Sequence, residues 1–110
     1  MSTLKLTIKK QWFDMILSGE KTEEYREIKK HWERILTNDL QYYEQGWDAD
    51  FKKFDTVHFF NGAYYSESLP NFKIECKGIE IKTGNPIWGA ELNTDYFVIK
   101  LGKILTHSPQ

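Results

Sequence analysis

The spacing of apolar residues in the first third of the chain predicts two strands and two helices. Apolar and polar residues alternate over residues 4–8, which predicts a short half-buried strand. Over residues 9–18 apolar residues recur every three or four positions, which predicts a helix. Gly19 then stands where a glycine commonly ends a helix. Weaker alternation over residues 21–28 predicts a strand, and helical spacing over residues 31–36 predicts a second, short helix.

The second half of the chain is predicted to consist of β-strands. Residues 56–60 form one predicted strand, followed by Asn61-Gly62, a dipeptide common in tight turns. Residues 72–81 form another, but the apolar phase shifts at Gly78, which predicts a β-bulge that bends the strand. Residues 96–101 are apolar on both faces, so we expect a strand in the interior of a sheet.

The predicted elements together indicate an α+β fold. We expect about five or six strands, with the helices inserted early, arranged as a small mixed β-barrel because a bent strand helps a sheet to close. The acidic and aromatic stretch over residues 37–54 shows no clear period, and we expect a loop with one or two helical turns there. A turn is expected at residues 83–86.

Composition narrows the class of protein without naming its activity. The 110 residues match the size of one domain, spanning 1–110. The net charge is -1, with an excess of two basic residues in 1–36 and of three acidic residues in 37–56, so there is no general attraction to nucleic acid. The sequence has a single cysteine, no apolar run long enough to cross a membrane and no leader pattern at its start, from which we expect a cytoplasmic location.

The densest cluster of charged residues follows the first predicted helix. If residues 22–26 are extended, Thr22, Glu24 and Arg26 share one face, and the long side chain of Lys21 can reach the same side. Such a cluster could bind a polar ring or perform acid–base chemistry. The alternative is a solvated strand with surface ion pairs of little energetic value.

Other candidate residues lie in the second half of the chain. Glu75 is on the polar face of its strand, where it could act as a second carboxylate or pair with a lysine on a neighbouring strand. Tyr64, Tyr65 and Trp88 stand near turns and could stack on unpaired bases or simply pack under a loop. Cys76 falls on the apolar phase and is expected in the core.

The histidines give no indication of a metal site. They have no metal-ligand spacing with one another or with the cysteine, and His58 lies in an apolar strand, where we expect it to be packed and hydrogen-bonded. The sequence contains no glycine-rich phosphate loop and no nucleophile elbow. We therefore expect neither a metal nor a cofactor.

The segment from Gly19 to Arg26, GEKTEEYR, resembles the Gly-x-Lys-x-x-Glu-x-Arg signature of the ASCH-domain family (activating-signal-cointegrator homology). Residues 4–17 before it and residues 72–101 after it resemble the same family, so the resemblance covers nearly the whole chain. It implies a PUA-like fold, a small β-barrel with helices packed around it, and a cleft lined by the signature residues. It also implies RNA or a modified nucleoside as the ligand.

Small bacterial members of the family include amidohydrolases that remove the acetyl group from N4-acetylcytidine with a Lys, a Thr and a Glu. By this resemblance Lys21 corresponds to the Lys and Glu75 to the Glu, whereas Glu24 occupies the position of the Thr, so the hydroxyl is missing unless Thr22 replaces it. Glu24 or Glu75 would then act as the base. The resemblance implies ligand-binding roles for Gly19 and Arg26, and ribonuclease activity is a further possibility.

Three functions follow from these observations. The first is a module that binds RNA or a nucleoside in a charged cleft around Lys21, Glu24 and Arg26. The second is a hydrolase acting on an acylated nucleoside or on RNA, and a more distant third is a protein-interaction domain, which would show a contiguous apolar patch. The acidic segment 37–56 could form a lid over the cleft.

Overall fold

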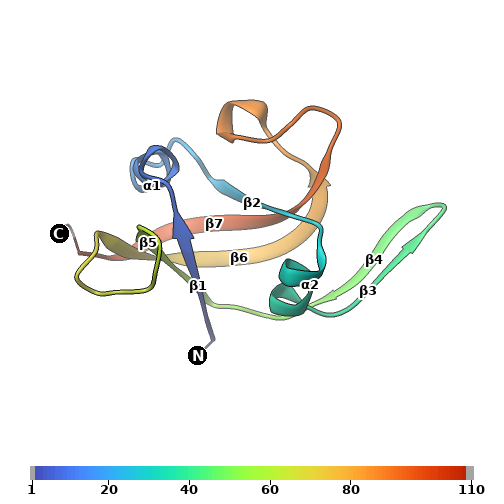
Figure 1. The fold of residues 1–110 in the computed structure, drawn as a ribbon, viewed down its shortest axis with the longest axis horizontal. Helices are drawn as coiled ribbons and strands as arrows, with labels where there is room; N and C mark the ends of the chain where they lie inside the picture. The colour runs from blue at the N-terminus through green and yellow to red at the C-terminus, as the bar shows by residue number, and fades with distance from the viewer. Residues whose placement is uncertain (1, 109–110) are drawn as a thin grey trace.

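The computed structural model describes residues 2–108 as a five-stranded mixed sheet, a two-stranded hairpin and short helices (Figure 1). The strands are β1 (Thr3–Ile8), β2 (Glu23–Glu27), β3 (Thr37–Tyr43), β4 (Gly46–Phe51), β5 (Thr56–Asn61), β6 (Asn71–Thr83) and β7 (Asp95–Ser108). The helices are α1 (Lys10–Leu17), α2 (Lys30–Leu36) and the 3₁₀ turn η1 (Pro86–Trp88). The predicted α+β class is confirmed.

The large sheet has the strand order β1-β5-β6-β7-β2. β1 and β5 pair in parallel, whereas the other neighbouring pairs are antiparallel. The sheet curls strongly and forms a half-barrel, with β1 and β2 as its two edges (Figure 1). In the described residues these two edges do not pair with each other, so the structure supports the curled sheet and leaves the closed barrel as a proposal.

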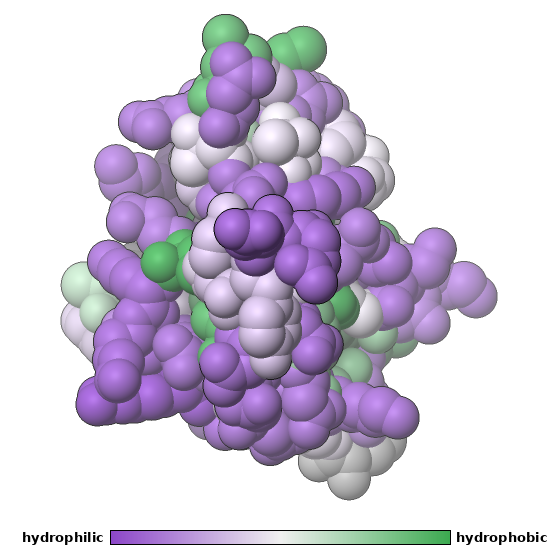
Figure 2. Space-filling model, turned by 90° about the vertical axis from the view of Figure 1, so that its right-hand side faces the viewer, coloured by the Kyte–Doolittle hydropathy of each residue, from purple (hydrophilic) through white to green (hydrophobic). Residues whose placement is uncertain are grey.

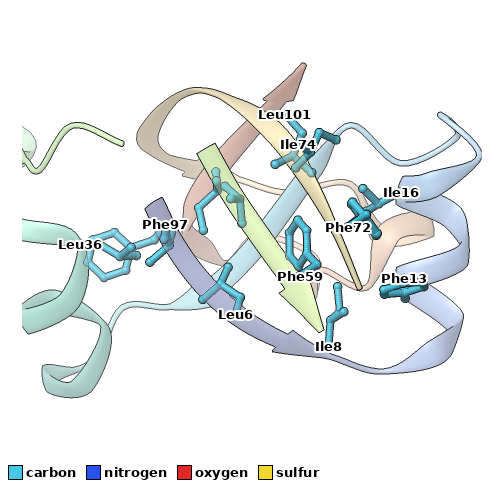
Figure 3. Close-up of a cluster of buried hydrophobic side chains, with 13 residues drawn as sticks. Leu6, Ile8, Phe13, Ile16, Leu36, Phe59, Phe72, Ile74, Phe97 and Leu101 are labelled. Atoms are coloured by element: carbon cyan, nitrogen blue, oxygen red, sulfur yellow. The ribbon is translucent and has the colours of Figure 1, made fainter. Parts of the chain in front are cut away.

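The core lies inside the curl of the sheet, where the helices cover it (Figure 3). At one end Phe13 and Ile16 of α1 pack near Phe72, and the Phe13 and Phe72 rings meet edge to face with centroids 4.8 Å apart. At the other end Leu36 of α2 lies beside Phe97 of β7. Because α1 and α2 each bury only one side, the three- and four-residue spacing of their apolar residues predicted them correctly.

Two predicted features of the long strands are confirmed. The β6–β7 register shifts several times between Lys73 and Gly78, and Gly78 adopts the positive φ of 128° that glycine tolerates. This is the bulge expected from the change of apolar phase. β7 lies between β6 and β2, and Phe97, Val98 and Ile99 are fully buried, as expected for an interior strand.

The prediction of a loop with helical turns over residues 37–54 is wrong. β3 and β4 form an antiparallel hairpin that projects from the main sheet (Figure 1). Tyr42 and Trp47 face each other across it with ring centroids 4.6 Å apart, and Gly46 begins β4 with a φ of 126°. Exposed strands have little apolar alternation, which is why the pattern was missed. The hairpin also raises the number of strands in the described residues from the expected five or six to seven.

The tight turn predicted at Asn61-Gly62 is also wrong. β5 ends at Asn61 and β6 begins at Asn71, so residues 62–70 form a longer loop. The Asn61 side chain donates to the Ile8 carbonyl at 3.2 Å and so ties β5 to the end of β1. His58 is buried and its Nε2 lies 2.9 Å from Asn71 Oδ1, which confirms the packed, hydrogen-bonded histidine.

Candidate functional site

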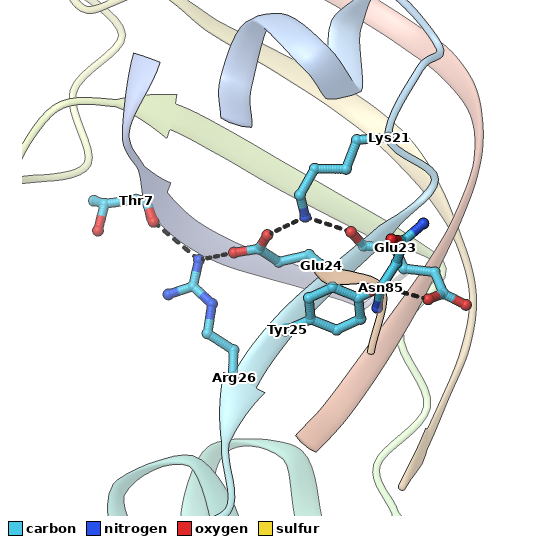
Figure 4. Close-up of polar contacts among 7 residues, drawn as sticks. All are labelled: Thr7, Lys21, Glu23, Glu24, Tyr25, Arg26 and Asn85. Atoms are coloured by element: carbon cyan, nitrogen blue, oxygen red, sulfur yellow. Dashed lines mark hydrogen bonds and ion pairs between the residues drawn. The ribbon is translucent and has the colours of Figure 1, made fainter. Parts of the chain in front are cut away.

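The charged segment after α1 forms a buried network of ion pairs (Figure 4). α1 ends at Leu17, and two residues later Gly19, with a positive φ of 86°, turns the chain toward β2. Glu24 Oε1 accepts a hydrogen bond from Lys21 Nζ at 2.8 Å, and Glu24 Oε2 accepts one from Arg26 at 2.6 Å. The extended backbone therefore places Glu24 and Arg26 on one face, as predicted.

Lys21 is among the most deeply buried side chains in the described residues. Its exposed fraction is 1% and that of Glu24 is 6%, so the alternative of a solvated charged strand does not hold for this pair. The Lys21 ammonium also donates to the Glu23 carbonyl and lies 5.7 Å from the Trp12 ring centroid and 5.0 Å from that of Tyr25. Burial lowers the pKa of Lys21 below its ordinary value, and the Glu24 carboxylate offsets part of this effect.

Arg26 connects the two edges of the curled sheet. Its guanidinium donates to the Thr7 carbonyl of β1 at 3.1 Å while it pairs with Glu24 of β2. The guanidinium carbon lies 4.8 Å from the Trp32 ring centroid, which is a cation–π contact. Arg26 Nε is buried and has no hydrogen-bond partner among residues 2–108.

A second network attaches the loop after β6 to β2. The Tyr25 hydroxyl donates to Glu23 Oε1 at 2.7 Å and accepts from the Asn85 backbone at 2.9 Å. Lys82 pairs with the other Glu23 oxygen at 2.9 Å. Burial raises the pKa of Tyr25 above its ordinary value, and the Glu23 carboxylate raises it further. These bonds hold residues 84–89 close to the buried ions.

A pocket of about 980 Å³ opens above this network. All four tryptophans of the chain line it, and they come from four separate segments: α1, α2, the β3–β4 hairpin and η1. Tyrosine rings from β2, β3 and β7 line it as well. The full lining is Trp12, Glu24, Tyr25, Arg26, Glu27, Ile28, Trp32, Tyr42, Trp47, Trp88, Gly89, Glu91, Asn93, Thr94, Asp95 and Tyr96.

The charges that line the pocket are mostly acidic. Glu24, Glu27, Glu91 and Asp95 contribute carboxylates, and Arg26 contributes the one lining cation in the described residues. Glu24 is neutralised by its two partners, whereas Glu27, Glu91 and Asp95 are exposed and form no ion pair within residues 2–108. The rim of the pocket is therefore negative.

The face seen in Figure 2 is predominantly hydrophilic. Pale and green side chains occur there in small groups separated by polar ones, so this face presents no continuous apolar patch. A protein-interaction surface would require such a patch, and this face gives the third hypothesis no support.

The residues singled out from the sequence fall into two groups. Lys21, Glu24 and Arg26 come together as expected. Glu24, Arg26 and Trp88 line the pocket, whereas Lys21 is buried outside its lining. Gly19 shapes the preceding turn and does not line the pocket.

The remaining candidates lie outside the pocket lining. Thr22 precedes β2 and is exposed, and its carbonyl accepts a bond from the Leu101 backbone. Glu75 is exposed on β6, where its carboxylate accepts a long hydrogen bond from the Lys103 backbone at 3.4 Å. Tyr64 is in the loop after β5 and is 62% exposed. The structure does not bring these three residues to the Lys21 network.

Most of the aromatic wall was missed in the sequence. Trp12 and Trp32 belong to the apolar spacing that predicts the two helices, and Tyr42 and Trp47 lie in the segment predicted as a loop. The available clue was the high aromatic content, 15% of the chain, because aromatic rings can line a binding face as well as fill a core.

The structure adds three observations on the other expectations. The part of the chain that is described contains no group of three or more His, Cys, Asp or Glu side chains placed to hold a metal ion. Cys76 is half-buried against the core, and burial raises the pKa of its thiol. No helix within residues 2–108 is long and apolar enough to span a membrane.

Comparisons with known proteins give this chain no relative. No protein-family model, no curated protein and no solved structure matches it.

Proposed function

We propose that this protein binds a nucleoside, with the base held in the aromatic pocket above Lys21, Glu24 and Arg26. We also propose that the curled sheet corresponds to the PUA-like barrel of the ASCH family, which the segment from Gly19 to Arg26 resembles. The observation that carries the proposal is the pocket lining: all four tryptophans line one pocket, together with Glu24 and Arg26 of the hydrogen-bonded ion network.

The pocket has the dimensions and the chemistry that a base requires. Its volume of about 980 Å³ lies at the upper end of the range for small-molecule sites. Aromatic rings stack on any base, because every base has a π-face. Asn93 and Thr94 in the lining can bond the polar edge of a base, and so can Glu24, because a carboxylate has more acceptor positions than its two cations occupy.

The charge around the pocket favours a nucleoside over a long RNA. Binding to a nucleic-acid backbone depends on lysine and arginine side chains that neutralise phosphates. Here the exposed lining charges are Glu27, Glu91 and Asp95, which would repel phosphates. We therefore expect short single-stranded RNAs to bind more weakly than the corresponding nucleosides.

Tryptophan fluorescence tests the proposal directly, because every tryptophan lines the pocket. A panel of nucleosides is titrated into the wild-type protein, Trp88→Ala and Tyr64→Ala. Loss of one stacking ring should weaken binding about tenfold or more. Tyr64 is also an aromatic residue beside a turn, but it lies outside the lining, so its replacement should leave affinity unchanged. Equal losses in the two variants would show that the pocket is not the binding site.

One observation favours hydrolysis of an acylated nucleoside as a second candidate. The Lys21 ammonium is held 2.8 Å from Glu24, and burial lowers its pKa. Glu24 lines the pocket and could activate water once one of its bonds opens. Lys21 is outside the lining but is bonded to Glu24, so the opening of that bond would free its ammonium to stabilise the oxyanion that forms. Glu75 lies outside the pocket lining, so Glu24 is the carboxylate available for this role.

The hydrolase candidate is tested by mass spectrometry of N4-acetylcytidine incubated with wild-type protein or with Lys21→Met. Loss of the acetyl mass with the wild type alone would support it. Equal turnover by a folded Lys21→Met protein, with folding checked by circular dichroism, would remove Lys21 from the mechanism. Binding without turnover in either protein would leave nucleoside binding as the function.

A further inference from the structure

Three carboxylates lie together at the rim of the pocket. Glu27 at the end of β2, and Glu91 and Asp95 in and after the loop between η1 and β7, are exposed and line the same pocket. None of them forms an ion pair within residues 2–108, although the protein has basic residues elsewhere on its surface. Their charges therefore act on whatever occupies the pocket.

The aromatic walls of the pocket, like the rim carboxylates, favour a positively charged ligand. The face of an indole or phenol ring carries partial negative charge and attracts cations, and tryptophan does so most strongly. Four tryptophan rings and three tyrosine rings line this pocket. Four lining carboxylates against Arg26 and the buried Lys21 leave an excess of two negative charges around the cavity.

We propose that the pocket selects nucleosides whose base carries a fixed positive charge, such as an N-methylated purine cation. This inference rests on the proposed nucleoside binding and specifies its ligand class. A planar cation gains from stacking, from cation–π attraction and from the rim carboxylates simultaneously, whereas a neutral base gains only the first of these three contributions. A phosphate-bearing ligand gains from none of the exposed charges.

The size of the cavity favours a cationic base over a methylated ammonium group. A cage for a methylammonium group encloses a few atoms between ring faces. This cavity of about 980 Å³ is far larger and is bordered by Asn93 and Thr94, which can bond the edge of a flat heterocycle. The lining thus fits a whole nucleoside with polar edges.

Guanosine and 7-methylguanosine provide the matched test, because they share their shape and their Watson–Crick edge. They differ by the methyl group that replaces the N7 acceptor and by the positive charge that it brings. Both are titrated into the full chain by tryptophan fluorescence at mildly acidic pH and at two salt concentrations. We expect 7-methylguanosine to bind about tenfold tighter or more, with a preference that falls as salt rises. 1-Methyladenosine and adenosine form a second matched pair.

A charge-neutralising variant tests the rim. Glu27→Gln/Glu91→Gln/Asp95→Asn should reduce the preference for 7-methylguanosine to a few-fold. The control variant Glu20→Gln/Asp39→Asn/Glu44→Gln changes the net charge equally at exposed positions outside the pocket lining, and should keep the full preference. An equal loss in both variants would assign the effect to net charge and overturn the role of the rim.

The outcomes separate this inference from the function on which it rests. If each neutral nucleoside binds as tightly as its methylated counterpart, nucleoside binding stands and charge selection fails. If no nucleoside binds, both fail. If trimethyllysine binds and the cationic nucleosides do not, the pocket serves a methylammonium group and the assignment to a base is overturned.

Discussion

The buried Lys21–Glu24–Arg26 network leads to a prediction about unequal costs of mutation. Glu24 is the shared acceptor of two cations, at 2.8 Å from Lys21 and 2.6 Å from Arg26. Replacing it by Gln leaves both cations without a counterion, and one of them is almost completely buried. Replacing Lys21 by Met leaves Glu24 still paired with Arg26. We expect Glu24→Gln to be much more destabilising than Lys21→Met.

The magnitudes follow from burial. Removing one partner of a buried ion pair costs about 3–5 kcal/mol when the other charge remains unpaired, which is the case for Glu24→Gln. Lys21→Met loses the hydrogen bonds to Glu24 and to the Glu23 carbonyl, but the protein no longer buries an ammonium group. Because Met also fills a similar volume, the cost in stability should be about 1–2 kcal/mol. Asp14→Asn is the control, since Asp14 pairs with Lys10 at 2.7 Å with side chains 53% and 77% exposed. Its cost should stay under about 0.5 kcal/mol.

The assay is urea unfolding of the wild type and the three variants at neutral pH, followed by circular dichroism. The Glu24→Gln deficit should also shrink toward about pH 9, because a buried lysine without its carboxylate loses its proton more readily in the folded state than in the unfolded chain. Stability then rises with pH, since the unfolded state binds more protons. A Lys21→Met protein less stable than Glu24→Gln would refute the assignment of Glu24 as the shared counterion.

Two further predictions concern Gly19, Gly89 and Tyr25. Gly19 and Gly89 have φ values of 86° and 100°, but an added Cβ meets nothing within 4 Å at Gly19, whereas at Gly89 it lies 2.9 Å from the Trp12 ring. Gly19→Ala should therefore lower the free energy of unfolding by about 1 kcal/mol, and Gly89→Ala should lower it further and also weaken nucleoside binding. Equal unfolding midpoints of the two variants would show that the Trp12 ring moves aside without cost. The pKa of Tyr25 is raised in the folded protein, so the unfolded chain releases the phenol proton at a lower pH than the folded one does. The contribution of Tyr25 to stability is therefore complete below pH 10.0 and falls as the pH rises above that value. Tyr25→Phe should make the free energy of unfolding fall less steeply with alkaline pH. An unchanged dependence on pH would contradict the hydrogen bonds assigned to the Tyr25 hydroxyl.

Local sequence pattern predicted the elements that contribute one face to the core. α1, α2, β1 and the bent β6 were all expected, because an amphipathic element shows its period in the chain itself. β5 was expected as well, although its residues 56–60 are buried on both faces. Local pattern did not predict the hairpin of β3 and β4, because its stability comes from pairs such as Tyr42 and Trp47 that meet only across strands. The parallel pairing of β1 with β5 was equally invisible, because it joins residues separated by about fifty positions.

The site was predictable to the extent that it is local. Lys21, Glu24 and Arg26 lie within six residues, so an extended strand was enough to bring them together. Glu75 was assigned to the same site through resemblance, and the pairing of β6 with β5 and β7 leaves it outside the pocket lining. A residue from a distant strand can be assigned to a site only when the strand order is known.

The aromatic wall gives a reason for the hairpin that packing alone does not. A two-stranded ribbon outside the main sheet is marginally stable and gains most from the apolar surface it covers. In this hairpin Leu40 and Phe51 pack against the core, whereas Tyr42 and Trp47 lie farther out, stack on each other and line the pocket. The inner pair therefore holds the hairpin in place, and the outer pair contributes rings to the pocket wall. Ligand binding would stabilise this outer end in particular, so protection of the hairpin amides from hydrogen exchange on adding nucleoside is the observation that would connect the hairpin to function.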